Sequence, residues 1–318
     1  MRGIISYSSS GDFRLAGFKS PNFVMILAKC SDCPTIHTSR MGRALSRREA
    51  ISRGNRMSGN TEVNAARRKP IEINTVTINN VLEALAAGMR DMRKGFRYSV
   101  LIGLFLAAGG WVLALLLIRF HLPYLVYPLA MAFALISPFI ATSLYEISRR
   151  IEKDEPLSWG AIFASVREAT RRDMGWMALV TAFSFVIWMD IAAFMTFGFF
   201  GLSARSVTVF VDQIFSTPSG IAFLLLGNAV GASFALTVFS ITVISFPILF
   251  DRDIDFVTAM ITSVRTVLAN PRAMLAWFVT IGFFSALSFL SLFVGLIFFF
   301  PLLGHATWHV YRRVIAPA

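Results

Sequence analysis

The sequence predicts an all-α protein of the polytopic membrane class: a helical bundle of six transmembrane helices arranged as three units, each an amphipathic helix followed by a hairpin. Hydrophobic residues make up 56% of the 318 residues and charged residues only 15%, with 31 Phe, a composition that soluble domains do not reach. Five long stretches contain almost no charge. A seven-residue pattern occurs three times, each time before one of these stretches.

The N-terminal part carries most of the positive charge. Residues 1–97 contain 17 Lys and Arg against 7 Asp and Glu, whereas the remaining chain contains 13 against 11. We therefore predict a disordered basic tail over residues 1–70 and a six-span transmembrane domain over residues 71–315. Basic segments beside membrane spans favour the cytoplasm, so the tail is assigned there, and nucleic acid is not expected as a partner.

Both cysteines lie in this tail. Cys30 and Cys33 form a C-x-x-C pair with His37 nearby, but a structural zinc site needs four ligands and a supporting fold. We interpret the pair as free of metal. Met41 and Met57 are alternative translation starts, and a start at either would remove the pair from the protein.

The charge-poor stretches cover residues 98–118, 122–145, 174–204, 214–250 and 273–304. Each is long enough for a helix to cross ~30 Å of hydrocarbon, which takes ~20 residues. The last is too long for one span, because a helix over residues 273–311 would measure about 58 Å. We expect two helices there that turn near residues 291–295, which gives six spans in total.

The repeated pattern lies at residues 84–90, 161–167 and 259–265. In each copy Ala is followed six residues later by Arg, with small and apolar residues at the same offsets between them. The surrounding segments are predicted to be amphipathic helices at the cytoplasmic interface, where basic side chains reach phospholipid head groups. These helices cover residues 78–94, 159–172 and 254–269. The alternative is that they are loop helices packed on the spans.

Six spans place every basic segment on one side of the membrane. These segments are the tail, residues 146–173, residues 251–272 and the pair Arg312 and Arg313. Five spans would leave that pair on the opposite side, against the positive-inside bias. We therefore expect a multi-pass protein with both termini in the cytoplasm and the phospholipid bilayer as its main partner.

Asp190 is the sole charge in the third stretch and is predicted to form a polar centre within the membrane. A carboxylate in hydrocarbon costs at least ~2.5 kcal/mol, so this side chain should face the bundle or carry a proton. The functional interpretations are a proton or cation relay or a metal ligand. The alternative is a structural residue held by hydrogen bonds.

His305 and His309 are four residues apart on the last predicted helix, so their imidazoles share one face. Two imidazoles at this spacing can bind a divalent transition metal when another helix supplies a third ligand. They cannot be the two axial ligands of one haem, which approach the iron from opposite faces. The alternative is interfacial hydrogen bonding beside Trp308, where aromatic residues commonly anchor a helix.

Charged residues gather where the second and fourth spans leave the membrane. With the two histidines they form a predicted cytoplasmic rim: Glu146, Arg149, Asp251, Arg252, Asp253, His305 and His309. Such residues are usually solvated ion pairs that fix the depth of a helix. They could also form a cytoplasmic gate or a head-group site.

A stripe of small residues follows one face of the fourth span: Gly227, Gly231 and Ala235. Small side chains let two helices approach closely. The stripe therefore predicts a close helix contact, either within the fold or in a homo-oligomer.

Three motifs carry a resemblance to a known family. They are LGHATWHVYR at residues 303–312, SLYEISRR at residues 143–150 and SFPILFDRD at residues 245–253. Together they resemble a bacterial domain-of-unknown-function family of predicted integral inner-membrane proteins, over roughly residues 70–315. The resemblance implies the inner membrane as the location and gives no activity. Some members are labelled cytochrome c oxidase subunit I homologue, but that subunit holds its haems and copper with more histidines than the four of this chain.

The leading hypothesis for function is a non-enzymatic membrane protein with no cofactor and a transport, lipid-interaction or scaffold role. The chain has no phosphate-binding glycine loop, no Ser/His/Asp constellation and no H-E-x-x-H sequence, and its loops are short. The alternative is a metal- or haem-associated factor of the respiratory chain that uses His305 and His309. A third hypothesis is an adaptor whose basic tail recruits cytoplasmic partners.

Overall fold

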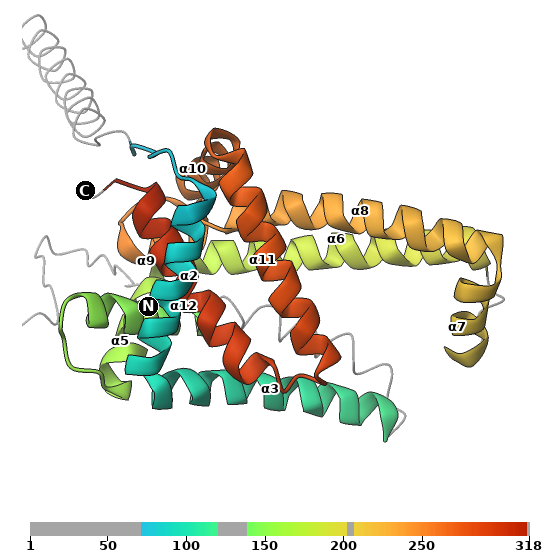
Figure 1. Ribbon diagram of the computed structural model, residues 1–318, viewed down its shortest axis with the longest axis horizontal. Helices are drawn as coiled ribbons and strands as arrows, with labels where there is room; N and C mark the ends of the chain where they lie inside the picture. The colour runs from blue at the N-terminus through green and yellow to red at the C-terminus, as the bar shows by residue number, and fades with distance from the viewer. Residues whose placement is uncertain (1–70, 120–138, 202–206, 317–318) are drawn as a thin grey trace, which may run out of the picture. The chain divides into compact units, whose positions relative to one another are not determined.

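The described part of the chain is built from helices (Figure 1), and the computed structural model describes residues 71–119, 139–201 and 207–316. These residues belong to one structural unit, Pro70–Ala318. The predicted tail lies outside the described residues, together with Cys30, Cys33 and His37. Within the described residues, the extended pairing is a single isolated bridge between Ile73 and Ile315.

The helices follow one another through short connections. In chain order they are α2 (Ile78–Lys94), α3 (Phe96–Ile118), the helical residues 139–152, α5 (Trp159–Ala169), α6 (Gly175–Phe200), α7 (Val207–Ser216), α8 (Pro218–Thr242), α9 (Ser245–Asp251), α10 (Phe256–Ala269), α11 (Pro271–Leu290) and α12 (Leu296–Val314). A π-helical turn over Thr170–Met174 joins α5 to α6. In Figure 1, α3, α6 and α8 run away from the short helices α2, α5, α9 and α10.

The three copies of the repeated pattern lie on α2, α5 and α10, and each of these helices leads directly into a long apolar helix. Local sequence fixes where each one begins. Thr77 and Asn80 form a capping box at the start of α2, the Ser158 hydroxyl accepts from the backbone of Ala161, and the Asp255 carboxylate accepts from the backbone of Thr258. These side chains satisfy backbone N–H groups that the first turn of a helix leaves unpaired. The helices predicted at these three places are confirmed.

Four helical segments are long and apolar enough to cross a membrane: Phe96–Leu116, Gly175–Phe200, Pro218–Asp251 and Pro271–Leu290. The turn predicted near residues 291–295 is confirmed, because α11 ends at Leu290 and α12 begins at Leu296. Most of the predicted second span falls on residues 120–138, outside the described residues. The count of six spans stays a prediction.

Helix α7 is an element that the sequence analysis missed. It begins between the third and fourth charge-poor stretches, contains Asp212 and ends one residue before Thr217, which caps α8 by accepting from the backbone of Gly220. Pro218 then occupies the first turn of α8, where its missing N–H does no harm. The Thr-Pro pair is therefore the sequence signal for this helix boundary.

Helix α12 lies at the centre of the unit and packs against α2, α3 and α11. Two glycines make the close contacts possible. A Cβ at Gly88 of α2 would lie 2.6 Å from the backbone nitrogen of Ala306, and a Cβ at Gly103 of α3 would overlap the backbone of Ile297. Any larger residue at these positions would push the two backbones apart.

Large apolar side chains cover the outside of the long helices. Phe105 on α3, Phe194 on α6, Leu225 on α8 and Phe283 on α11 are all exposed by more than half of their surface. A soluble protein rarely exposes such continuous apolar surface, whereas a bilayer accommodates it. The fold therefore agrees with a membrane environment for these four helices.

Candidate functional site

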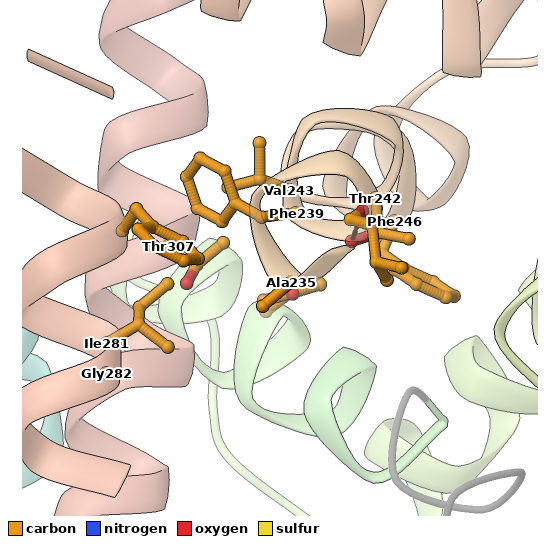
Figure 2. A pocket seen from close by; sticks show the side chains of 11 residues that line it. Ala235, Phe239, Thr242, Val243, Phe246, Ile281, Gly282 and Thr307 are labelled. Carbon is orange, nitrogen blue, oxygen red and sulfur yellow. Dashed lines mark hydrogen bonds between the residues drawn. The ribbon is translucent and has the colours of Figure 1, made fainter. Parts of the chain in front are cut away.

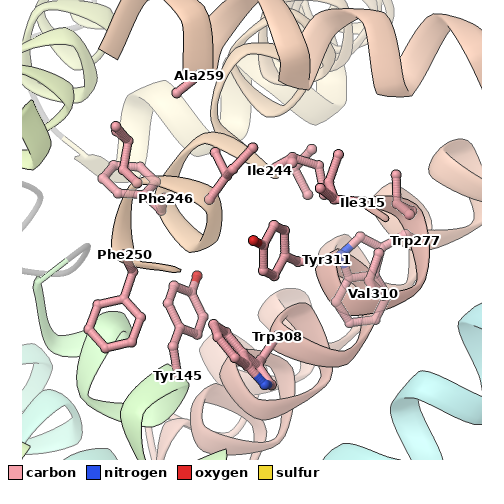
Figure 3. Packing of buried hydrophobic residues seen from close by; sticks show 14 of the residues in the cluster. Tyr145, Ile244, Phe246, Phe250, Ala259, Trp277, Trp308, Val310, Tyr311 and Ile315 are labelled. Carbon is pink, nitrogen blue, oxygen red and sulfur yellow. The ribbon is translucent and has the colours of Figure 1, made fainter. Parts of the chain in front are cut away.

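The three sequence motifs meet in space and form one buried centre. Tyr145 from residues 139–152, Phe250 from α9 and Trp308 from α12 form a triangle of aromatic rings (Figure 3). The ring centroids are 6.3 Å apart for Tyr145–Phe250, 6.3 Å for Tyr145–Trp308 and 6.2 Å for Phe250–Trp308. Aromatic pairs at this separation contribute about 0.5–1.5 kcal/mol each beyond the burial of their area. The triangle therefore ties together three segments that are far apart in the chain.

His305 lies fully buried beside this triangle, and both of its ring nitrogens are engaged. Nε2 lies 2.9 Å from the hydroxyl oxygen of Ser99 on α3, and Nδ1 lies 2.8 Å from the hydroxyl oxygen of Ser148. The imidazole therefore acts as a bridge between α3 and residues 139–152.

A second hydrogen-bonded pair continues from Ser148. Its hydroxyl hydrogen-bonds to Asp91 on α2, and Oδ2 of Asp91 lies 2.7 Å from Nε2 of His309. Burial acts to raise the pKa of Asp91, but the hydrogen bonds and charges of the surrounding groups, with His309 foremost, hold it below its ordinary value.

The result is a continuous polar chain, which we call the histidine chain. Its members, in order, are Ser99, His305, Ser148, Asp91 and His309. They come from α3, α12, residues 139–152 and α2, so the chain joins four helical segments. Its interior is closed to water, which strengthens each hydrogen bond and makes the loss of any one of them expensive.

Glu146 is a second buried polar group, one residue after Tyr145. Its side chain is fully buried, with Oε1 2.7 Å from Nε of Arg150 and Oε2 2.5 Å from Nη2 of Arg149. The hydroxyl of Ser165 on α5 also donates to Oε1, over 2.8 Å. The predicted ion pair between Glu146 and the following arginines is therefore present, and it connects residues 139–152 to the next pattern-bearing helix.

The acidic and basic residues that end α9 hold the C-terminal end of the described chain. The hydroxyl of Tyr311 donates to Oδ2 of Asp251 over 2.6 Å, and Arg252 donates to the backbone oxygen of Ala316. The tyrosine hydroxyl is the donor in this pair because an ionised carboxylate only accepts. Asp253 is exposed in the connection between α9 and α10.

Asp190 lies apart from this centre. It is in the middle of α6 with its side chain exposed, so the described structure does not bring it together with Glu146, Asp251 or the histidines. The histidine chain is a separate, buried polar centre, and a polar membrane centre at Asp190 stays a prediction. The small-residue stripe of α8 is used within the chain, because a Cβ at Gly231 would lie 3.0 Å from the Trp188 ring on α6. A homo-oligomer through this stripe stays a prediction.

The described residues contain no group of three or more His, Cys, Asp or Glu side chains placed to hold a metal ion. The two histidines have different partners, since His305 is bonded to two serines and His309 to Asp91. A metal bound by both would require at least one of these hydrogen bonds to break. The metal and haem hypothesis stays a prediction.

An apolar pocket of about 460 Å³ opens next to the aromatic triangle (Figure 2). Around it lie Phe239 of α8, Val243 directly after α8, Ile281 and Gly282 of α11, and Thr307 of α12, and Tyr145 lines it as well. The hydroxyl of Thr307 donates to the backbone oxygen of Leu303, so it is directed towards its own helix. The pocket therefore presents mostly carbon surface.

Three members of the histidine chain were missed by the sequence analysis: Asp91, Ser99 and Ser148. The signal for Asp91 was available, because it follows Ala84 and Gly88 at the spacing of one helix face. That face is the buried one in the structure. A carboxylate on the small-residue face of an amphipathic helix predicts a buried polar contact. Nothing local to Ser99 or Ser148 distinguishes them from other serines in apolar helices.

The apolar helices, their exposed hydrophobic surface and the buried polar centre define an integral, multi-pass membrane protein. The family model described as Predicted integral membrane protein (DUF2189) matches residues 126–251. This match confirms the resemblance to a domain-of-unknown-function family of integral membrane proteins. The matched range includes residues 143–150 and ends within residues 245–253. No curated protein and no solved structure matches the chain.

Proposed function

We propose that this membrane protein binds the acyl chain of a membrane lipid in the pocket between α8, α11 and α12. The observation that carries the proposal is the pocket of about 460 Å³ beside the aromatic triangle. Its volume lies within the ~300–1,000 Å³ range of small-molecule sites. Since α8 and α11 are both long and apolar enough to span a membrane, the molecules that surround them are lipids.

The chemistry of the pocket favours hydrocarbon over a polar solute. Thr242 and Thr307 line it, but their hydroxyls donate to the backbone oxygens of Val238 and Leu303 within their own helices. Phe239 and Ile281 supply apolar surface. A polar solute would lose its hydration there without gaining equivalent hydrogen bonds, whereas an acyl chain in the bilayer has no hydration to lose.

A glycine in the pocket provides a direct test. A Cβ at Gly282 would meet no atom within 4 Å, so the substitution Gly282→Phe places a ring in the pocket without a backbone clash. The control is Gly198→Phe on α6. A Cβ at this position is equally unobstructed, and Gly198 does not line the pocket. The probe is a phospholipid with a photoreactive diazirine in its acyl chain, incorporated into nanodiscs with the full chain.

Peptide mapping of the photoproducts gives the outcome. We expect adducts concentrated on residues 235–246 and 278–282, reduced several-fold by Gly282→Phe and unchanged by Gly198→Phe. Adducts spread evenly over all exposed helix faces, or adducts on these residues that persist in Gly282→Phe, would overturn the proposal and leave the pocket as a packing defect.

We also propose that the domain crosses the inner membrane six times as three amphipathic-helix-plus-hairpin units, with both termini in the cytoplasm. The pairing of the two ends supports an even number of crossings. The backbone of Asn74 donates to Val314, and the backbone of Ala316 donates to Glu72, so these residues lie on the same side of the membrane. An even number requires residues 120–138 and α12 to return the chain across the bilayer.

Contacts of the pattern-bearing helices support the three units. Ser165 of α5 bonds to Glu146, and Ser263 of α10 accepts from the backbone of Ile244, so each helix contacts the segment that ends the preceding hairpin. In both pairs the residues are 19 apart in the chain. Gly88 of α2 lies against Ala306 of α12, so the first unit contacts the last helix of the third unit.

Cysteine accessibility tests this topology. Single cysteines are placed at Ser291 and at Ala318 in a chain whose Cys30 and Cys33 are replaced by Ser. We expect Ser291→Cys to react with a membrane-impermeant maleimide from the periplasm and Ala318→Cys to react only after the cytoplasmic side is opened. Labelling of both from the same side would contradict the third hairpin.

A further inference from the structure

The outward face of α6 carries an apolar stripe interrupted by one carboxyl group. Phe183, Phe194 and Phe197 expose 65%, 78% and 60% of their surface, and Ile187 exposes 37%. Together with Asp190, these residues occupy positions 183, 187, 190, 194 and 197. Their alternating intervals of four and three residues place them on one face of the helix. Asp190 lies at the middle of this stripe and is itself exposed.

The stripe points away from the partner that α6 has within the chain. Helix α6 meets α8 through Trp188, whose ring stacks on Phe234 with centroids 5.7 Å apart and lies against Gly231. Asp190 is two residues after Trp188, so it lies about 200° around the helix, on the opposite side. In a single copy of the described unit, the carboxyl group therefore faces the hydrocarbon of the bilayer.

That position is unfavourable for an isolated chain. A charged carboxylate at the centre of a span costs at least ~2.5 kcal/mol, and a carboxylic acid without a hydrogen-bond partner also loses its hydration. A carboxyl group that keeps its proton has one donor and free acceptor sites. It is therefore complementary to a second copy of itself, and two such groups related by a twofold axis form two reciprocal hydrogen bonds.

We infer that a second copy of this chain covers the α6 stripe, with the two Asp190 side chains hydrogen-bonded to each other across the twofold axis. The phenylalanines on either side of Asp190 pack in the same seam, above and below the carboxyl pair. A polar residue within an apolar seam also fixes the register of the two helices, because any slip separates the pair. This surface is distinct from the small-residue stripe of α8.

Cross-linking in membranes tests the geometry. The full chain, with Cys30 and Cys33 replaced by Ser, carries a single cysteine either at Phe194 on the stripe or at Leu225 on α8. The two positions are matched, because both side chains are more than 70% exposed and both lie near the same end of the α6–α8 hairpin. We expect oxidation to give covalent dimers for Phe194→Cys and none above background for Leu225→Cys.

The carboxyl pair is tested by two substitutions followed by single-molecule photobleaching at varied protein-to-lipid ratio. Asp190→Leu removes the hydrogen bonds and suits lipid, so the dimer should weaken by about tenfold, the value of one to two such bonds in a membrane. Asp190→Asn keeps a donor and an acceptor and should retain the dimer. A monomer at all ratios would overturn the inference, as would equal dimerisation of Asp190→Leu. A second variant combines Phe194→Cys with one cysteine introduced within residues 120–138. An intramolecular disulfide in this variant would assign the stripe to that segment and overturn the inference.

Discussion

Nε2 of His309 on α12 lies 2.7 Å from Oδ2 of Asp91 on α2, and this contact connects residues that are 218 positions apart in the chain. It brings the last described helix onto the first one. The side chains are only 19% and 10% exposed, so water competes weakly for the pair. The depressed pKa of Asp91 indicates that the folded state favours the ionised carboxylate.

This pair should stabilise the fold measurably more than its exposed neighbour. A double-mutant cycle with Asp91→Asn and His309→Gln is expected to give a coupling energy of about 1–2 kcal/mol in the free energy of unfolding in detergent. The control joins the same two helices: Arg313 and Glu83 are 3.6 Å apart and 29% and 63% exposed. Its cycle should give less than about 0.5 kcal/mol. Equal coupling in the two cycles would show that burial does not strengthen the first pair.

The sequence predicts features that depend on local contacts, such as helix positions, and not features that depend on contacts between distant residues. Periodicity and caps such as Thr77 and Ser158 place the pattern-bearing helices, because those signals act within one turn. The polar centre depends on contacts such as that of Ser99 with His305, 206 positions apart. For Asp190, the cost of a carboxylate in lipid predicted a residue that faces the bundle or carries a proton. The structure places it on the exposed face because the helix face towards α8 is fixed by the fit of Trp188 to Gly231.

The buried carboxylate of Glu146 is expected to contribute more to the free energy of unfolding than an exposed carboxylate that pairs with the same arginine. In Glu146→Gln the buried position loses its charge, and Arg149 and Arg150 lose the carboxylate that neutralises them. We expect a loss of about 2 kcal/mol in the free energy of unfolding, because removing one member of a buried ion pair leaves the other uncompensated. Glu155 is the matched control, since it also lies near Arg150, at 3.2 Å, with 45% of its side chain exposed. A similar loss in Glu155→Gln would contradict a special role for burial.

Two Gly→Ala substitutions should have effects of opposite sign. Alanine favours a helix over glycine by about 1 kcal/mol, which by itself predicts stabilisation at both Gly88 and Gly282. At Gly88, however, the new Cβ would lie 2.6 Å from the backbone of Ala306, so α2 and α12 must separate and the histidine chain must stretch. We expect Gly88→Ala to lower the free energy of unfolding by about 2 kcal/mol. At Gly282 the Cβ has no atom within 4 Å, and the variant should be neutral or more stable. Stabilisation by Gly88→Ala would mean that the two helices are farther apart than the structure shows.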